Sequence, residues 1–307
     1  MNSQKTLIAV VGPTAIGKTA AAIKLAQHYH TSIISADSRQ FYKEMSVGTA
    51  KPTTEEQKAA KHYFIDSCSI TENYTAGDFE KDALAVINQV FKQTDLAIIA
   101  GGSGLFIKAV CEGFDELPTA KEGIREELNQ QFAANGIQWL QEQLKAADPE
   151  YYKEVDINNP QRLIRALEVF KTTGLPFSSY RLANKNKRPF NIIKIGLNVA
   201  RELLYDRINR RVDIMIDEGL LKEAESLLPY RHLNALQTVG YNELFDYFDG
   251  KTDLPAAIEL IKQHTRQFAK RQLTWFKKDK EIIWIDPLTD NVIELADRLI
   301  KQINPAV

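Results

Sequence analysis

Continuous apolar runs alternate with amphipathic segments along the first hundred residues. Four runs have the composition of buried strands and stand at residues 6–11, 32–35, 63–65 and 95–100. Between them, residues 20–26 and 78–91 repeat their apolar side chains at the spacing of an amphipathic helix. Strands that are buried on both faces are typical of parallel sheets with helices on each side. The pattern therefore predicts an α/β fold.

The pattern changes between residues 118 and 189, where apolar residues recur at helical spacing and no strand intervenes. Helices are expected at residues 123–134, 139–146 and 160–171, and a basic loop at residues 181–188 closes the segment. Apolar runs at residues 190–199 and 282–285 then predict strands that return to the first sheet. We expect an α/β core from residues 1–117 and 190–307, and an all-helical insertion domain from residues 118–189.

Composition narrows the class of protein. The chain has 307 residues and is 44% hydrophobic, which is enough for a sizeable core. No apolar run approaches the ~18 residues of a membrane span, and the polar N-terminus lacks the apolar region of a signal peptide. We expect a soluble, cytoplasmic protein without a membrane segment. Cys68 and Cys111 match no zinc spacing, so both are expected to be reduced structural thiols.

The net charge is nearly balanced, with 39 Lys and Arg against 40 Asp and Glu. This balance argues against an unspecific binder of polyanions but leaves room for a local basic surface. Residues 262–280 contain seven basic residues, one acidic residue and three interleaved aromatics. Such a segment either follows a nucleic-acid backbone or forms an ordinary amphipathic helix with its aromatics in the core. Both interpretations stay open.

A phosphate-binding loop stands between the first predicted strand and the first predicted helix. Residues 12–19 read GPTAIGKT and fit the pattern G-x-x-x-x-G-K-[ST]. A strand, a glycine turn and a helix N-terminus together direct backbone N–H groups at a polyphosphate. Lys18 adds a positive charge, and the Thr19 hydroxyl is suited to a metal ion that bridges phosphate oxygens. In this context a P-loop NTPase-like core is favoured over a plain glycine turn.

Polar residues follow two other predicted strands of the sheet. Asp37 comes directly after the second strand, beside Ser38, Arg39 and Gln40, and the glycine-rich segment that contains Ser103 follows the fourth. The carboxyl ends of parallel strands meet at one edge of a sheet, where ligands bind. Asp37 is therefore a candidate general base or metal ligand. The alternative is that its side chain only caps the next turn.

Two predicted helices carry grouped basic residues. Gln161, Arg162 and Arg165 share a polar stripe, and Arg207 and Arg211 stand one turn apart on a later helix. The first group is suited to a phosphate or a base edge. The two arginines of the second group are expected to project in the same direction, toward a phosphate. A solvated helix face is the alternative for the first group, and surface ion pairs are the alternative for the second.

Six segments, taken in chain order, carry a family resemblance. They are GPTAIGKT at 12–19, SADSRQFYKEMSVGTAKP at 35–52, GGSGLFIKAV at 101–110, NPQRLIRALEVF at 159–170, VGYNEL at 239–244 and AKRQLTWF at 269–276. Together they resemble the bacterial tRNA dimethylallyltransferases, which are also called tRNA isopentenyltransferases. Only the phosphate loop is shared with general nucleotide kinases.

This resemblance implies a prenyl transfer to tRNA. The dimethylallyl group of dimethylallyl diphosphate would pass to N6 of the adenosine 3′-adjacent to the anticodon, in tRNAs that read codons beginning with U. The phosphate loop would hold the diphosphate of the donor, and the flipped tRNA base would enter a channel from the opposite end. The resemblance also implies Mg²⁺ as cofactor, the anticodon stem-loop as partner and a monomeric protein.

The resemblance assigns roles to individual residues. Asp37 would be the general base, Ser103 would stand at the channel where the family usually has threonine, and Arg211 would act with Lys18 on the leaving diphosphate. Thr19 would help to place Mg²⁺. The diphosphate would be bound by Gly12, Pro13, Thr14, Ala15, Ile16, Gly17, Lys18 and Thr19.

Three segments and two single residues match positions that contact tRNA in the family. They are Asp37, Ser38, Arg39, Gln40, Ser103, Arg125, Gln161, Arg162, Leu163, Ile164, Arg165, Gln237, Thr238, Val239, Gly240, Tyr241 and Asn242. The last segment departs from the family, because basic residues common at its two ends are here Gln237 and Asn242.

Three alternatives to the prenyltransferase are considered. A P-loop kinase for small molecules would share the loop, Asp37 and the sheet, but would need a nucleoside triphosphate. A GTPase is disfavoured because residues 184–187 read NKNK and lack the aspartate of a guanine-specifying N-K-x-D element. A tRNA-binding module with a vestigial phosphate loop would bind tRNA without turnover.

Overall fold

The structure divides into two compact units, each described separately. It is a computed structural model that describes residues 5–115, 117–118, 120–181 and 187–303. One unit comprises residues 1–112 and 187–307, and the other comprises residues 113–186. These divisions fall within five residues of the boundaries expected from the change in sequence pattern.

A six-stranded sheet forms the centre of the larger unit. Its strand order is β3-β2-β4-β1-β5-β6, and every neighbouring pair is parallel. The strands are β1 (Thr6–Val11), β2 (Ile33–Ser35), β3 (His62–Tyr63), β4 (Leu96–Gly101), β5 (Asn191–Leu197) and β6 (Ile283–Ile285). The predicted parallel sheet is confirmed, including the two strands that return after residue 189.

Helices cover both faces of this sheet. Side chains alternate between the faces along a strand, so Leu7 and Val11 of β1 belong to one core cluster and Ile8 and Val10 to the other. The first cluster includes residues of α3 (Ala76–Val90) and α4 (Gly104–Glu112). The second includes residues of α1 (Lys18–His28) and α12 (Val292–Ile303).

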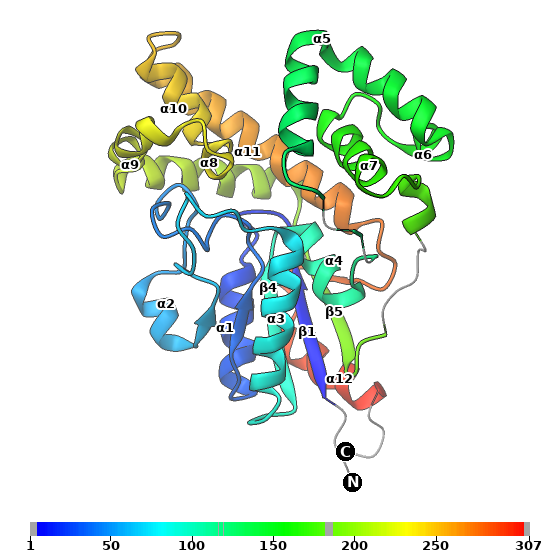
Figure 1. The fold of residues 1–307 in the computed structure, drawn as a ribbon. Coiled ribbons are helices and arrows are strands. Elements are labelled where there is room, and N and C mark those ends of the chain that lie inside the picture. The colour runs from blue at the N-terminus through cyan, green and yellow to red at the C-terminus, as the bar shows by residue number, and fades with distance from the viewer. Residues whose placement is uncertain (1–4, 116, 119, 182–186, 304–307) are drawn as a thin grey trace. The chain divides into compact units, whose positions relative to one another are not determined.

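A layer of helices from the second half of the chain lies beyond the carboxyl ends of the strands (Figure 1). They are α8 (Arg201–Asp217), α9 (Leu220–Leu227), α10 (Tyr241–Phe248) and α11 (Leu254–Phe276), with short 3-10 turns at Leu228–Tyr230 and Asn234–Leu236. Leu204, Ile208 and Val212 stand four residues apart on one face of α8 and are buried. This layer brings side chains from the second half of the chain to the edge of the sheet where the phosphate loop lies.

The third strand differs from the prediction. It covers His62–Tyr63 instead of residues 63–65, and the short helix α2 (Thr54–Ala59) precedes it. Phe64 and Asp66 have φ angles of 64° and 52°. A strand cannot continue through this left-handed region, so pairing ends at Tyr63.

The smaller unit contains only helices among its described residues. They are α5 (Ile124–Ala147), α6 (Pro149–Glu154), α7 (Pro160–Thr173) and the 3-10 turn Phe177–Tyr180, and they enclose a core that includes Leu128, Leu140, Leu144 and Leu163. The two helices predicted at residues 123–134 and 139–146 form one element with a break at Gly136, whose φ is 72° and ψ is −176°. Asn159 caps α7, where its Oδ1 accepts a hydrogen bond from the N–H of Arg162 at 3.3 Å. Of the basic loop at residues 181–188, residues 182–186 lie outside the described part.

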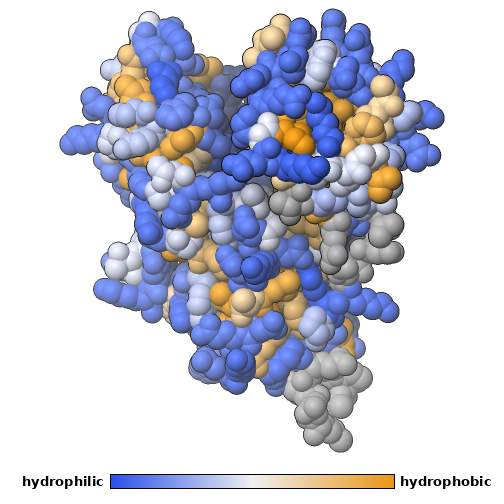
Figure 2. All heavy atoms as spheres, viewed as in Figure 1, coloured by the Kyte–Doolittle hydropathy of each residue, from blue (hydrophilic) through white to orange (hydrophobic). Residues whose placement is uncertain are grey.

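Hydrophilic residues predominate on the face shown in Figure 2, and hydrophobic residues form small patches between them. Within the described ranges, we find no helix with both the length and the apolar character needed to cross a lipid bilayer. Cys68 and Cys111 are both buried and free, as expected of structural thiols.

Candidate active site

The phosphate loop joins β1 to α1 with the geometry of an anion site. Gly17 has a φ of 104° and stands immediately before the first residue of α1, a conformation that side chains other than glycine rarely adopt. The first turn of α1 contains no acidic residue. The positive end of the helix dipole therefore faces the loop without a competing carboxylate.

Lys18 lies at the centre of this loop. Its Nζ donates a hydrogen bond to the carbonyl oxygen of Pro13 at 2.7 Å. Burial lowers the pKa of Lys18 from 10.5 to about 8, with Asp37 opposing the shift and Arg211 adding to it. An ammonium group in this position gains more from a bound anion than an exposed lysine would, because little water competes for it.

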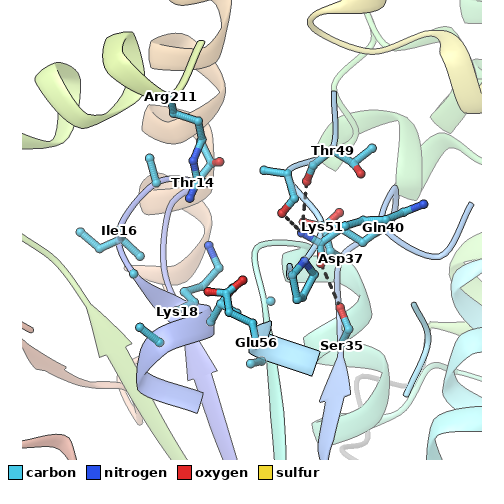
Figure 3. Close-up of a pocket in the computed structure, with 18 of the residues that line it drawn as sticks. Thr14, Ile16, Lys18, Ser35, Asp37, Gln40, Thr49, Lys51, Glu56 and Arg211 are labelled. Carbon is cyan, nitrogen blue, oxygen red and sulfur yellow. Dashed lines mark hydrogen bonds between the residues drawn. The ribbon is translucent and has the colours of Figure 1, made fainter. Parts of the chain in front are cut away.

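A cavity of about 460 Å³ lies over the loop. Thr14, Lys18 and Arg211 are on one side of it, and Asp37 and Gln40 are on the other (Figure 3). Burial also lowers the pKa of Arg211, against the opposite effects of Glu56 and Asp37. The cavity thus places the cationic groups of Lys18 and Arg211 opposite Asp37, with Glu56 and Glu218 also in its lining.

Asp37 combines the two alternatives that the sequence left open. It follows β2 and lines the cavity, and its Oδ1 also accepts a hydrogen bond from the backbone N–H of Arg39 at 3.0 Å. The Ser103 Oγ accepts a hydrogen bond from the N–H of Ser38 at 2.9 Å. These two hydrogen bonds fix the backbone that directly follows Asp37.

A second cavity, of about 420 Å³, shares a wall with the first. Thr14, Asp37 and Arg211 line both. The second cavity is also lined by most of the residues of this unit that are expected to contact tRNA. These lining residues are Ser38, Arg39, Ser103, Gln237, Thr238, Val239, Gly240 and Asn242. One carboxylate therefore faces two adjoining spaces, one over the phosphate loop and one beside the 237–242 segment.

Gln272 of α11 links the loops that follow β1 and β4, and it was not among the residues predicted from the sequence. Its Oε1 accepts a hydrogen bond from the N–H of Thr14 at 2.8 Å, and its Nε2 donates to the carbonyl oxygen of Gly102 at 2.9 Å. Gln272 is buried and lines both cavities. A sequence signal exists, because Gln272 lies on the apolar stripe of α11 between the buried residues Ala269 and Phe276.

Arg207 and Arg211 of α8 line different cavities. Arg211 lines both cavities, whereas Arg207 lies in a separate cavity with Lys24, where its Nη1 donates to the carbonyl oxygen of Ile16 at 3.3 Å. The expectation that Arg207 and Arg211 project toward one phosphate is wrong, because the two side chains reach different sides of the loop. Arg210 forms the ion pair with Asp206 that the alternative predicts.

Some expected tRNA contacts have buried side chains. Leu163 and Ile164 belong to the core of the helical unit, and Tyr241 is fully buried in the α/β unit. Their side chains therefore present no surface to a macromolecule. Gln40 lines the first cavity, where its amide donates to the carbonyl oxygens of Thr49 at 3.1 Å and Ala50 at 3.0 Å.

In the helical unit, Arg125 and Arg165 both contact one buried carboxylate. Glu168 accepts hydrogen bonds from Arg125 and Arg165, each at 3.2 Å. Arg125 also donates to Gln161 Oε1 at 2.9 Å, and Arg162 is exposed. Helical spacing places Gln161, Arg165 and Glu168 on one stripe of α7, so the carboxylate that pairs with Arg165 was predictable from the sequence, although the sequence prediction did not include it.

The basic segment at residues 262–280 is neither wholly an ordinary amphipathic helix nor wholly a surface for a nucleic-acid backbone. Lys262 pairs with Asp213 and Glu259, and Phe276 is buried, as in an ordinary amphipathic helix. Phe268 is 41% exposed and lines both cavities. The segment therefore contributes part of the cavity wall as well as part of the core.

The cavity fits a magnesium ion that is held mainly by a substrate. Thr19 offers a hydroxyl oxygen and Asp37 a carboxylate oxygen to the same space. Mg²⁺ commonly takes one or two protein oxygens and completes its shell with phosphate oxygens and water. Elsewhere in the described residues, Glu112, Asp279 and Glu281 lie close together, but the Lys194 ammonium pairs with all three at 2.6 to 3.0 Å.

The chain matches the model of a known protein family. The family model described as IPP transferase matches residues 40–279, which is most of the chain. The chain belongs to the IPP transferase family. The resemblance inferred from six sequence segments is thereby confirmed.

Members of this family with known names are similar over nearly the whole length. The tRNA dimethylallyltransferase of Christiangramia forsetii is 54% identical over 298 residues, covering 97% of this chain and 98% of the relative. That of Flavobacterium johnsoniae is 55% identical over 292 residues, covering 93% and 94%.

Solved structures show the same architecture. The tRNA isopentenylpyrophosphate transferase of Bacillus halodurans matches with a TM-score of 0.73 and 36% identity, over 98% of both chains. A eukaryotic dimethylallyltransferase acting on tRNA matches with a TM-score of 0.82, over 98% of this chain and 79% of the other. At 24% identity, this second match supports the fold alone.

Proposed function

We propose that this protein transfers the dimethylallyl group of dimethylallyl diphosphate to N6 of the adenosine 3′-adjacent to the anticodon. The acceptors are tRNAs that read codons beginning with U. The observation that carries this proposal is the pair of adjoining cavities with Asp37, Thr14 and Arg211 in their shared wall. The donor occupies the cavity over the phosphate loop, and the acceptor base enters the other.

Asp37 acts as the general base in this proposal. The adenine N6 is a weak nucleophile because its lone pair is delocalised into the ring, so a carboxylate must accept its proton as the new bond forms. The N6–carbon bond forms, the carbon–oxygen bond to the diphosphate breaks, and the N6 proton passes to Asp37. The position of Asp37 between the two cavities suits this step.

Lys18 and Arg211 stabilise the charge that grows on the diphosphate as it leaves. Both are in the wall of the donor cavity, and the N–H groups of residues 15–19 add dipoles that need little reorganisation. Mg²⁺, held by Thr19 and the diphosphate, would supply additional charge neutralisation when bound. An enclosed site also protects an allylic cation from water.

The tRNA contacts divide between the two units. In the α/β unit we propose contacts from residues 38–40, Ser103, residues 237–240 and Asn242. In the helical unit we propose Arg125, Gln161, Arg162 and Arg165, whose donor groups suit phosphate oxygens. We expect the protein to act as a monomer.

The test is turnover with defined substrates. The protein with Mg²⁺ and dimethylallyl diphosphate should convert an unmodified U-reading tRNA to the N6-prenylated form, detected by mass spectrometry of its nucleosides. If no prenyl adenosine forms and ATP is consumed with a small acceptor, the kinase interpretation is correct. If tRNA binds without any turnover, the protein is a binding module.

Asp37→Asn tests the role of Asp37 as general base more sharply than Asp37→Ala does. Asparagine keeps an Oδ1 that accepts the 3.0 Å hydrogen bond from Arg39, so the turn is retained while the proton acceptor is lost. Turnover should fall by about 10²- to 10⁴-fold, with tRNA affinity nearly unchanged. An equal loss of affinity and turnover would mean that Asp37 binds tRNA instead of accepting a proton.

A further inference from the structure

Residues 46–53 form part of the wall of both cavities. Val47, Lys51 and Thr53 line the donor cavity, Gly48 lines the acceptor cavity, and Thr49 and Ala50 line both. This segment lies between β2 and α2 and belongs to neither a strand nor a helix. Its position therefore depends on contacts made by other parts of the chain.

Glu223 of α9 holds the first part of this wall through the backbone. Its Oε2 accepts hydrogen bonds from the N–H groups of Ser46 and Val47, both at 2.8 Å, and its Oε1 accepts one from Gly48 at 2.8 Å. Hydrogen bonds to an ionised carboxylate are about twice as strong as neutral ones. Three successive N–H groups that converge on one carboxylate fix the orientation of this backbone.

Tyr241 connects the same carboxylate to the acceptor segment. Its hydroxyl donates to Glu223 Oε1 at 2.7 Å. Burial and the nearby Glu223 raise the pKa of Tyr241 well above its ordinary value, so the hydroxyl stays protonated and remains a donor. Tyr241 is the first residue of α10 and directly follows residues 237–240, which line the acceptor cavity.

Gly48 allows the tyrosine to approach this closely. A Cβ atom at this position would lie 2.5 Å from the Tyr241 hydroxyl oxygen and 2.6 Å from its ring. Any other residue would push the ring away from Glu223. The contact therefore depends on a glycine of the cavity wall, a buried tyrosine beside the acceptor segment and a carboxylate between them.

We propose that Glu223 and Tyr241 are positioning residues that hold the wall at residues 46–53 in register with the acceptor segment at residues 237–242. Neither side chain is among those that line the two cavities, so both act through the backbone. This inference rests on the proposed prenyl transfer. It assigns the alignment of the two substrates to a hydrogen-bond cluster outside the reacting groups.

Alignment has a large effect on such a transfer. The acceptor nitrogen, the allylic carbon and the leaving oxygen must be correctly oriented, and a misplacement of about 1 Å can cost about 100-fold in rate. Loss of the tyrosine hydroxyl should therefore reduce turnover of the bound substrates. The phosphate loop should be unaffected, because Gln272 and Lys18 hold it by separate contacts.

Tyr241→Phe removes this hydroxyl and keeps the ring. Tyr29→Phe is the matched control, because it loses a 2.8 Å hydrogen bond to Asp297, and Tyr29 lies outside the residues that line the two cavities. The kinetic constants for tRNA, the Tm and the binding of inorganic diphosphate are measured for both variants. We expect Tyr241→Phe to lower kcat/KM for tRNA by about tenfold, with diphosphate affinity changed by less than about twofold. Tyr29→Phe should leave the kinetics unchanged.

Glu223→Gln provides a second measurement. Its amide keeps one acceptor oxygen and replaces the other with an NH2 donor, which would face a backbone N–H group that now donates to the carboxylate. The loss in kcat/KM should therefore exceed that of Tyr241→Phe. Adding Tyr241→Phe to Glu223→Gln should then have little further effect, since both changes break one cluster.

The possible outcomes distinguish a failure of this inference from a failure of the proposed prenyl transfer. If the wild-type protein produces no prenyl adenosine, the proposed function fails and this inference fails with it. If the wild-type protein is active and Tyr241→Phe behaves like Tyr29→Phe in every measurement, only the inference is overturned. A loss of diphosphate binding in Tyr241→Phe that equals its loss of turnover would also overturn it, since that would indicate general damage to the fold.

Discussion

Replacing Lys18 with methionine removes a buried ammonium group and keeps most of the side-chain volume. The pKa of Lys18 is lowered from 10.5 to about 8, mainly by burial. The folded protein therefore holds the charged form at a cost, which the unfolded chain does not have. We expect Lys18→Met to be inactive and yet more stable than the wild-type protein at pH 7.

The expected gain in the free energy of unfolding follows from the shift in the pKa of Lys18. One pKa unit corresponds to about 1.4 kcal/mol, so the full shift amounts to about 3 kcal/mol. Water in the cavity screens part of this cost, and the variant also loses the hydrogen bond to Pro13, which contributes about 1 kcal/mol. We expect a net stabilisation of about 1–2 kcal/mol at pH 7, or a rise in Tm of about 2–8 °C.

The pH dependence has a definite sign. Below pH 8 Lys18 is charged in both the folded and the unfolded protein, so the cost is complete. Between pH 8 and 10.5 the folded protein releases the proton first, and the cost decreases as the pH rises. The stability advantage of Lys18→Met should therefore be largest near pH 7 and become smaller toward pH 10.

Thermal unfolding at several pH values measures this difference, with Lys24→Met as the control. Lys24 lies on the same helix and is exposed, so its replacement should change stability by less than about 0.5 kcal/mol. Calorimetric titration with diphosphate at pH 9, in buffers of different ionisation enthalpy, should show proton uptake in the wild-type protein. A Lys18→Met variant that is less stable than the wild type at pH 7, or an advantage that does not decrease with pH, would refute the reasoning.

Three further predictions concern residues around the site. Gln272→Met leaves the Thr14 N–H and the Gly102 carbonyl without their partner, so thermal unfolding should show a Tm lower by about 4–10 °C and calorimetry weaker diphosphate binding. An unchanged Tm would contradict this role. Glu168→Gln should weaken tRNA affinity about two- to tenfold in filter binding, while kcat at saturating tRNA stays unchanged, because Arg125 and Arg165 lose their carboxylate. Ser103→Ala removes the acceptor for the Ser38 N–H and should lower kcat by about three- to tenfold, with recovery in Ser103→Thr; equal activity of all three proteins would exclude this role.

The strands were predictable because burial on both faces leaves continuous apolar runs. The same signal failed at residues 63–65, since positive φ angles at Phe64 and Asp66 depend on tertiary contacts that short-range patterns do not record. The phosphate loop and Asp37 were predictable because each directly follows a strand, and topology then brings the two strand ends together.

Contacts between distant parts of the chain explain what the sequence did not reveal. Gln272 reaches Thr14 across 258 positions, and Glu223 reaches Ser46 across 177 positions. No local spacing encodes such pairs. Arg207 and Arg211 illustrate a related limit, because helical spacing gives the face on which side chains start but not the side of a neighbouring loop that each one reaches.

The shared wall of the two cavities has a consequence for inhibitor design. A single compound that carries a diphosphate mimic and an adenine-like ring could occupy both spaces across Asp37. When two weak ligands are joined by a linker of suitable length, the second binds at an effective concentration in the millimolar range or above. A short linker suits this protein, because Thr14, Asp37 and Arg211 border both spaces at once. Such bisubstrate compounds would distinguish this enzyme from phosphate-loop kinases, which would not offer the acceptor space beside residues 237–242.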